Sequence, residues 1–207
     1  MAYKRSRNKM KKLLLFSFFL SCLSGFAQDS EGYFDITQKD NGKTIRFIQS
    51  PDRDIQNTMT GNIETKKYVA YYNNLSSTKN SKGAKQIQYK LGFLIMDIFD
   101  FDIPKNSRLL IKFKNGQTMT LTTNTNNTSS LKYIDGLKRY YTSASYIITT
   151  QQLNRIINLG VSKIRIETQV RNIDVEPKVD FSELTKEFKV ALYDRLNNKK
   201  DSFTDGF

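Results

Sequence analysis

The sequence predicts an α+β domain with a largely antiparallel sheet, on which a short helix and a C-terminal helix are packed. Two observations lead to this fold class. Short hydrophobic stretches with strand-like spacing fill most of the chain, whereas helical spacing occurs only after residue 149. The first half also lacks the regular alternation of strands and helices that a parallel sheet requires.

Three short strands are expected in the first half, at residues 34–37, 44–48 and 67–72. Polar turns such as Asp40-Asn41-Gly42 separate them. The following residues, 76–85, are polar and aperiodic, which predicts a mobile loop.

The strand after this loop is predicted to be central. Apolar side chains recur at every second position, namely at Ile87, Tyr89, Leu91, Phe93 and Ile95. Residues 94–98 are then apolar on both sides, as expected for a strand buried on both faces. Pro104 is expected to end this strand, because proline has no N–H to donate to the ladder.

Asn115-Gly116 predicts a β-hairpin between two alternating segments. A two-residue turn would place the apolar residues of the two strands on opposite faces. A three-residue loop, with Gly116 in the left-handed conformation and a bulge, instead pairs Ile111 with Met119 and Leu109 with Leu121. The bulged hairpin is therefore predicted.

A strand–helix–strand unit follows. A short strand at 146–148 leads to Thr149, which stands three residues before Gln152, the spacing of a capping box. The buried face of this helix is expected to consist of Leu153, Ile156 and Ile157. Gly160 is expected to end the helix in a left-handed cap, before a strand that contains Ile164 and Ile166.

The C-terminal helix is predicted after Pro177, with Asp180 and Glu183 at its cap positions. Its apolar residues keep a spacing of three or four, at Phe181, Leu184, Phe188, Leu192 and Leu196. One face of this helix is therefore expected to pack across the sheet.

Residues 1–27 have the order of a cleavable signal peptide. A basic, acid-free start is followed by the apolar run 13–23, and Gly25 and Ala27 precede the expected cut before Gln28. Six of the 33 basic and none of the 20 acidic residues lie in this segment, so residues 28–207 carry a net charge of +7. We expect one domain over residues 28–207, exported to the periplasm or secreted.

Two alternatives to a cleaved signal peptide exist for the N-terminal segment. A transmembrane anchor is disfavoured because the apolar run is shorter than the roughly 20 residues that cross a bilayer. A lipid anchor on Cys22 is the minority interpretation, since Leu20-Ser21-Cys22 loosely matches a bacterial lipobox.

The chain contains no His, and its one Cys is Cys22. The exported chain therefore cannot build a His- or Cys-ligated zinc site, a Ser-His-Asp triad or a Cys-His dyad. No cofactor is predicted, and any catalysis would have to use Asp, Glu, Lys, Tyr, Ser or Thr.

Two groups of residues are candidate sites. Asp97, Asp100 and Asp102 could supply oxygen ligands to Ca²⁺ or Mg²⁺, although on a regular strand Asp97 faces away from the other two. Tyr71 and Tyr72 point to opposite faces of their strand, so at least one ring is expected to be exposed and available to a ligand.

The signal ending Gly25-Phe26-Ala27-Gln28 and the segments 110–117, 148–153 and 160–166 together resemble small uncharacterised exported proteins of Bacteroidetes. The resemblance spans roughly residues 107–170. It contains no catalytic motif, and it implies a location in the cell envelope.

The sequence thus predicts a non-catalytic envelope or secreted domain that binds a protein or glycan partner. A carboxylate-dependent hydrolase or lyase that uses Asp97, Asp100 and Asp102 is one alternative. A structural subunit of a surface assembly is another. Nucleic acid is not expected as a partner, and the oligomeric state stays open.

Overall fold

The computed structural model describes residues 32–40, 43–61, 63–79 and 85–197. The signal peptide predicted at 1–27 and Cys22 lie outside the described residues, as do residues 80–84 of the predicted loop.

The larger of two sheets has seven strands, and each is antiparallel to its neighbours. Its strands are β1 (Phe34–Asp40), β2 (Lys43–Gln49), β3 (Arg53–Thr60), β4 (Ile63–Lys79), β5 (Lys85–Asp97), β8 (Ser130–Ile134) and β9 (Leu137–Ile148). The order is β1-β2-β4-β5-β9-β8. Strand β3 also pairs with β4, along residues 63–70, whereas β2 pairs with residues 73–79. Strands β2 and β3 therefore both pair with the edge of β4 that faces away from β5.

The smaller sheet has four antiparallel strands in the order β11-β10-β6-β7. They are β6 (Arg108–Phe113), β7 (Thr118–Thr122), β10 (Val161–Glu167) and β11 (Asn172–Val175). The bulged hairpin prediction is confirmed in β6 and β7. Ile111 faces Met119, Leu109 faces Leu121, and Gly116 has a φ of 87°.

Two helices complete the described fold: α2 (Thr150–Leu159) and α3 (Phe181–Asn197). The capping box before α2 is present, because Thr149 accepts from the Gln152 N–H and the Gln152 side chain accepts from the Thr149 N–H. Gly160 ends α2 with a positive φ of 61°. Its ψ of 155° lies outside the left-handed helical region, which corrects that detail of the prediction.

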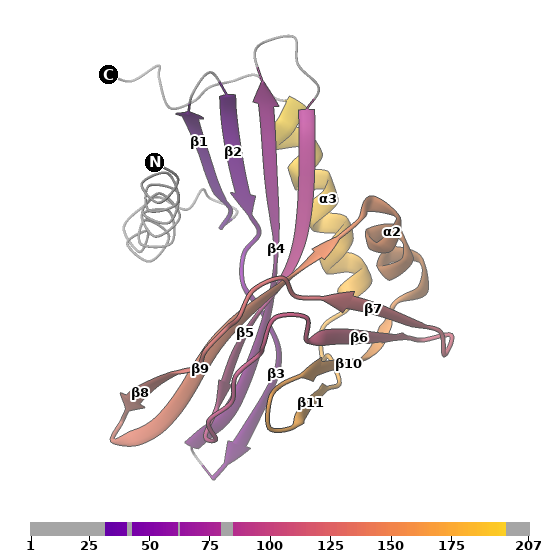
Figure 1. Cartoon of the computed structure of the whole chain (residues 1–207). Coiled ribbons are helices and arrows are strands. Elements are labelled where there is room, and N and C mark those ends of the chain that lie inside the picture. Colours follow the sequence, from indigo (N-terminus) through magenta and orange to yellow (C-terminus); the bar gives the residue numbers. More distant parts are fainter. Residues whose placement is uncertain (1–31, 41–42, 62, 80–84, 198–207) are drawn as a thin grey trace.

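Helix α3 packs against the larger sheet through Tyr72 of β4. The Tyr72 ring stacks on Phe188 with ring centroids 5.0 Å apart, and its hydroxyl lies 2.7 Å from the Thr185 Oγ1. Thr185 donates its own proton to the Phe181 carbonyl, so Tyr72 is the donor to Thr185. Figure 1 shows α3 running beside the long strands β4 and β5, with α2 next to α3.

Several sequence predictions need correction. Residues 76–79, expected in a loop, continue strand β4, because the ladders with β2 and β5 extend that far. Strand β5 is central as predicted, but it ends at Asp97 and not at Pro104. One sheet was expected and two are present, so the strands on either side of α2 belong to different sheets. Strands β3, β8 and β11 (Asn172–Val175) were not predicted.

Candidate functional site

The rings of Tyr71 and Tyr72 are both buried, so the expectation that one of them is exposed is wrong. Tyr72 is enclosed by α3. Tyr71 lies on the opposite face of β4, where its ring covers Gly92 of β5. Burial raises the pKa of Tyr71 to about 12. Neither tyrosine offers a flat exposed ring to a ligand.

The three aspartates after β5 are engaged in local structure. Asp97 is fully buried, accepts from the Phe99 N–H at 3.2 Å, and pairs with Arg171 from the β10–β11 turn. Asp100 accepts from the Ser129 hydroxyl, and Asp102 accepts from the Ser129 N–H at 2.9 Å. Within the described ranges, no three or more Asp, Glu, His or Cys residues are grouped so that they could hold a metal ion.

The most exposed apolar element of the larger sheet is the β8–β9 arm, the hairpin formed by residues 130–141. Asp135 and Gly136 make its two-residue turn with φ angles of 50° and 75°, and Ile134 faces Leu137 across it. Two consecutive positive φ angles are characteristic of a type I′ turn, for which Asp-Gly is a favoured sequence. In Figure 1 this arm extends away from the helices.

The hydrogen-bond pattern of the β8–β9 arm leaves the backbone N–H and C=O groups of two β8 residues pointing away from β9. Ile134 and Leu137 close a two-residue turn, so they exchange both backbone hydrogen bonds. The same holds for every second residue back along β8, which includes Lys132 opposite Arg139. Leu131 and Tyr133 therefore direct their N–H and C=O groups away from β9. No described strand pairs with this side of β8.

The side chains of β8 are also exposed to solvent. All five residues of the strand are exposed, with Tyr133 at 64% and Leu131 at 45%. Alternation places Leu131 and Tyr133 on one face and Lys132 on the other, where the Lys132 Nζ lies 5.3 Å from the centre of the Tyr141 ring. The free edge thus presents an apolar–basic–apolar sequence.

Arg139 fixes the base of the arm. Its side chain is buried; its Nε donates to the Glu64 carbonyl of β4 at 3.1 Å, and its Nη1 donates to the Lys138 carbonyl at 2.9 Å. The bond to Glu64 joins β9 to β4 beyond the end of β5, and the bond to Lys138 lies within β9 itself.

The remaining open edges differ from β8. Strand β3 has two register shifts, and its Ile55 carbonyl accepts from the Lys178 N–H at 2.8 Å, so part of its edge is occupied. The exposed side chains of β7 are threonines, and those of β11 are Asn172 and Asp174. Strand β1 also has an unpaired side, and its exposed side chains are the polar Asp35, Thr37, Gln38 and Lys39. Among these edges of the described chain, β8 alone combines unpaired backbone groups with a row of exposed apolar side chains.

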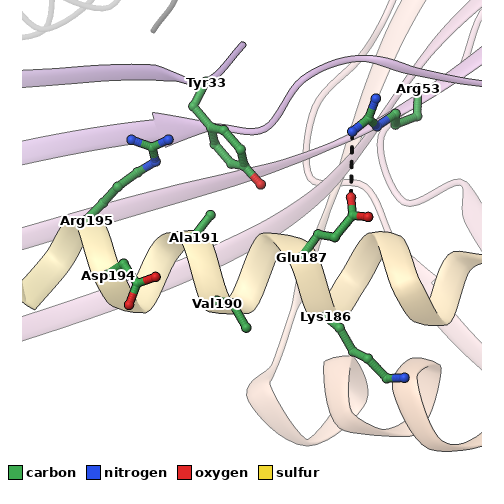
Figure 2. A pocket seen from close by; sticks show the side chains of 8 residues that line it. All are labelled: Tyr33, Arg53, Lys186, Glu187, Val190, Ala191, Asp194 and Arg195. Carbon is green, nitrogen blue, oxygen red and sulfur yellow. Dashed lines mark ion pairs between the residues drawn. The ribbon is translucent and has the colours of Figure 1, made fainter. Parts of the chain in front are cut away.

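An open hollow of about 690 Å³ lies beside α3. Figure 2 shows Arg53 and Glu187 on one side of it, joined by an ion pair of 3.6 Å, with Tyr33 and Arg195 on the other side. The Arg195 guanidinium stacks over the Tyr33 ring at 4.4 Å. Acidic and basic side chains both line this hollow, so it has no single charge preference for a ligand, and it contains none of the predicted site residues.

Sequence reasoning missed the β8–β9 arm although a signal was present. Ile134-Asp135-Gly136-Leu137 has the Asp-Gly pair between two apolar residues that predicts a tight hairpin.

No helix in the described part of the chain is long and apolar enough to cross a membrane. Comparisons with protein-family models, with curated proteins and with solved structures find no match to this chain.

Proposed function

We propose that this chain is an exported binding domain without a catalytic role, and that it binds an extended segment of a partner protein along β8. The observation that carries the proposal is the outward direction of the Leu131 and Tyr133 backbone groups on a strand with exposed apolar side chains. An extended peptide can pair with such an edge through main-chain hydrogen bonds, and its alternate side chains give specificity.

The chemistry of the partner segment follows from β8. The residues that face Leu131 and Tyr133 would be apolar, because cross-strand pairs of apolar side chains stabilise a sheet. The residue between them would face Lys132 and would be acidic, since an opposite charge there is favourable and a like charge is not. The partner therefore supplies an extended apolar–acidic–apolar segment.

The other functions considered from the sequence receive less support. Asp97, Asp100 and Asp102 are each hydrogen-bonded within the fold, so they do not form an open carboxylate site. The hollow beside α3 is lined by two carboxylates, Glu187 and Asp194, together with three basic side chains. A protein partner is favoured over a glycan because the free backbone groups of β8 match those of another strand.

Site-specific photo-crosslinking in cells of the source organism tests the proposal. Tyr133 is replaced by a photo-reactive benzoyl-phenylalanine, and Tyr193 of α3 is replaced in the same way as a matched control, because it is exposed to a similar extent, 69% against 64%. We expect a discrete protein adduct from position 133 and none from position 193.

A second variant distinguishes strand pairing from nonspecific contact. Leu131→Pro removes an N–H that points outward, so β8 keeps its hydrogen bonds to β9 while the edge loses a donor. The adduct from position 133 should disappear in this variant. The same adduct from positions 133 and 193, or an adduct that survives Leu131→Pro, would contradict the proposal.

Export is tested on the same material. We expect the protein recovered from the cell envelope or the medium to begin at Gln28. A chain that stays in the cytoplasm with Met1 intact would contradict this part of the proposal.

A further inference from the structure

The opposite edge of the larger sheet is β1, and its backbone pattern can be deduced in the same way. Asp40 and Lys43 close the connection between β1 and β2, so they and every second residue back to Phe34 exchange hydrogen bonds with β2. Asp35, Thr37 and Lys39 therefore direct their N–H and C=O groups outward. No strand in the described part of the chain pairs with this side of β1.

We propose that β1 pairs with β1 of a second copy of this chain, antiparallel and about a two-fold axis at Thr37. This register is centred on the strand, which runs from Phe34 to Asp40, so all of its residues are used. The outward-facing residues then meet one another: Asp35 faces Lys39 of the second copy, and Thr37 faces its counterpart. Each of these facing pairs can exchange two backbone hydrogen bonds.

The side chains of β1 are complementary in this register. Asp35 and Lys39 carry opposite charges, and the two-fold axis creates that pair twice. The Thr37 side chains form a threonine–threonine pair, another combination that stabilises neighbouring strands. Arg46 binds Asp35 through its Nε at 2.8 Å, and a carboxylate has further acceptor positions for the lysine of the second copy.

The half-buried apolar face of β1 would add one contact across the dimer. Phe34 and Ile36 lie on the face opposite Asp35, and Ile36 is paired with Phe47 of β2. All three side chains are half-buried. In the proposed register Ile36 of each copy lies diagonally across from Ile36 of the other, within reach of a side-chain contact.

The β8 edge lacks this self-complementarity. A two-fold pairing of β8 with itself, centred on its five residues, would place Lys132 opposite Lys132 of the second copy. Lys132 belongs to a pair whose hydrogen bonds point to β9, so the two lysines would meet at the close, non-hydrogen-bonded spacing. The self-association we propose therefore uses β1 and leaves β8 free, and it does not depend on the function proposed for β8.

Cysteine cross-linking tests the register. In a Cys22→Ser background the chain has no cysteine, so Thr37→Cys introduces one thiol. At a two-fold hydrogen-bonded pair the two Cα atoms lie about 5.5 Å apart, within the range that a disulfide spans. Gln38→Cys is the matched control, because Gln38 would face Ile36 of the second copy and its own counterpart would lie beyond about 7 Å.

We expect a covalent dimer from Thr37→Cys on mild oxidation and a monomer from Gln38→Cys. Equal cross-linking at both positions, or none at position 37, would overturn the proposed register.

Sedimentation equilibrium of the purified protein tests the dimer itself. Thr37→Pro removes an outward N–H and leaves the hydrogen bonds between β1 and β2 intact, so it should yield monomer only. Tyr133→Pro removes an outward N–H from the β8 edge and should leave the dimer unchanged. A wild-type protein that is monomeric at every concentration, or a dimer lost with Tyr133→Pro and kept with Thr37→Pro, would refute the proposal.

Discussion

Gly92 occupies a position in the larger sheet where a side chain would collide with a ring. A Cβ on Gly92 would lie 2.2 Å from the Cζ of Tyr71, and the ring is buried, so it has little room to move. We expect Gly92→Ala to lower the free energy of unfolding by about 1–3 kcal/mol, the usual cost of overpacking. Denaturant unfolding measures this change.

A double-mutant cycle tests the cause. In a Tyr71→Ala background the collision is absent, and alanine is favoured over glycine in a strand interior, so Gly92→Ala should no longer destabilise the protein. If Gly92→Ala lowers the free energy of unfolding equally in both backgrounds, the Tyr71 ring is not the cause of the destabilisation.

Asp97 is the buried member of an ion pair that joins the end of β5 to the β10–β11 turn. Asp97→Ala would leave the Phe99 N–H and the Arg171 guanidinium without their acceptor. We expect the free energy of unfolding to fall by about 3 kcal/mol. This value is at the lower end of the range for breaking a buried pair, because Arg171 is one-third exposed and can reach water. Asp100→Ala is the control, with an expected loss below about 1 kcal/mol, since Asp100 is exposed.

Buried tyrosines make the fold sensitive to alkali. Burial raises the pKa of Tyr68 and of Tyr71 to about 12, and the charge of Asp97 adds to the effect at Tyr68. A tyrosine in the unfolded chain has a pKa near 10. Between about pH 10 and 12 the unfolded chain therefore releases protons that the folded chain retains, so stability falls as the pH rises.

Tyrosinate absorbance and circular dichroism, recorded against pH, check this prediction. Tyr68 and Tyr71 should ionise together with the loss of structure, and Tyr71→Phe should move that transition to higher pH. Ionisation of both rings near pH 10 in an intact fold would contradict the prediction.

At the scale of single elements, α2 depends on the capping box at its start. Thr149→Ala removes the acceptor for the Gln152 N–H, and we expect it to lower the free energy of unfolding by about 1 kcal/mol. Thr150→Ala is the matched control, because this neighbouring threonine is exposed and makes no capping bond in the structure. Similar losses in both variants, measured by denaturant unfolding, would argue against the cap.

Elements with a local signal could be predicted from the sequence. The β6–β7 hairpin was predicted with its register because only the bulged loop at Gly116 places Leu109, Ile111, Met119 and Leu121 on one face. The start of α2 was predicted because Thr149 and Gln152 interact with each other at a fixed spacing.

Elements that depend on distant partners could not be predicted in this way. Residues 76–79 are polar and have no periodic pattern; they extend β4 because β2 and β5 supply ladder partners. Strand β8 is a different case, because Asp135-Gly136 between two apolar residues was a local hairpin signal that sequence reasoning missed. Periodicity placed Tyr71 and Tyr72 on opposite faces, but it could not show that α3 covers one face and that Tyr71 lies over Gly92 on the other.

At the scale of the whole molecule, β1 and β8 stand at opposite ends of the strand order of the larger sheet. Asp35, Thr37 and Lys39 make β1 complementary to itself, whereas Lys132 makes β8 complementary to an acidic segment and repels a second β8. We infer that one edge joins two copies of the chain while the other binds a different protein. A dimer of this kind would present two equivalent β8 edges to its partners.

Amide hydrogen exchange in the purified protein tests this division between the edges most directly, because it reports on the outward N–H groups themselves. The account predicts that Thr37, with Asp35 and Lys39, becomes protected as the protein concentration rises, while Leu131 and Tyr133 exchange rapidly at every concentration. Strong protection of Leu131 and Tyr133 without a partner, or rapid exchange at Thr37 in the concentrated protein, would contradict it.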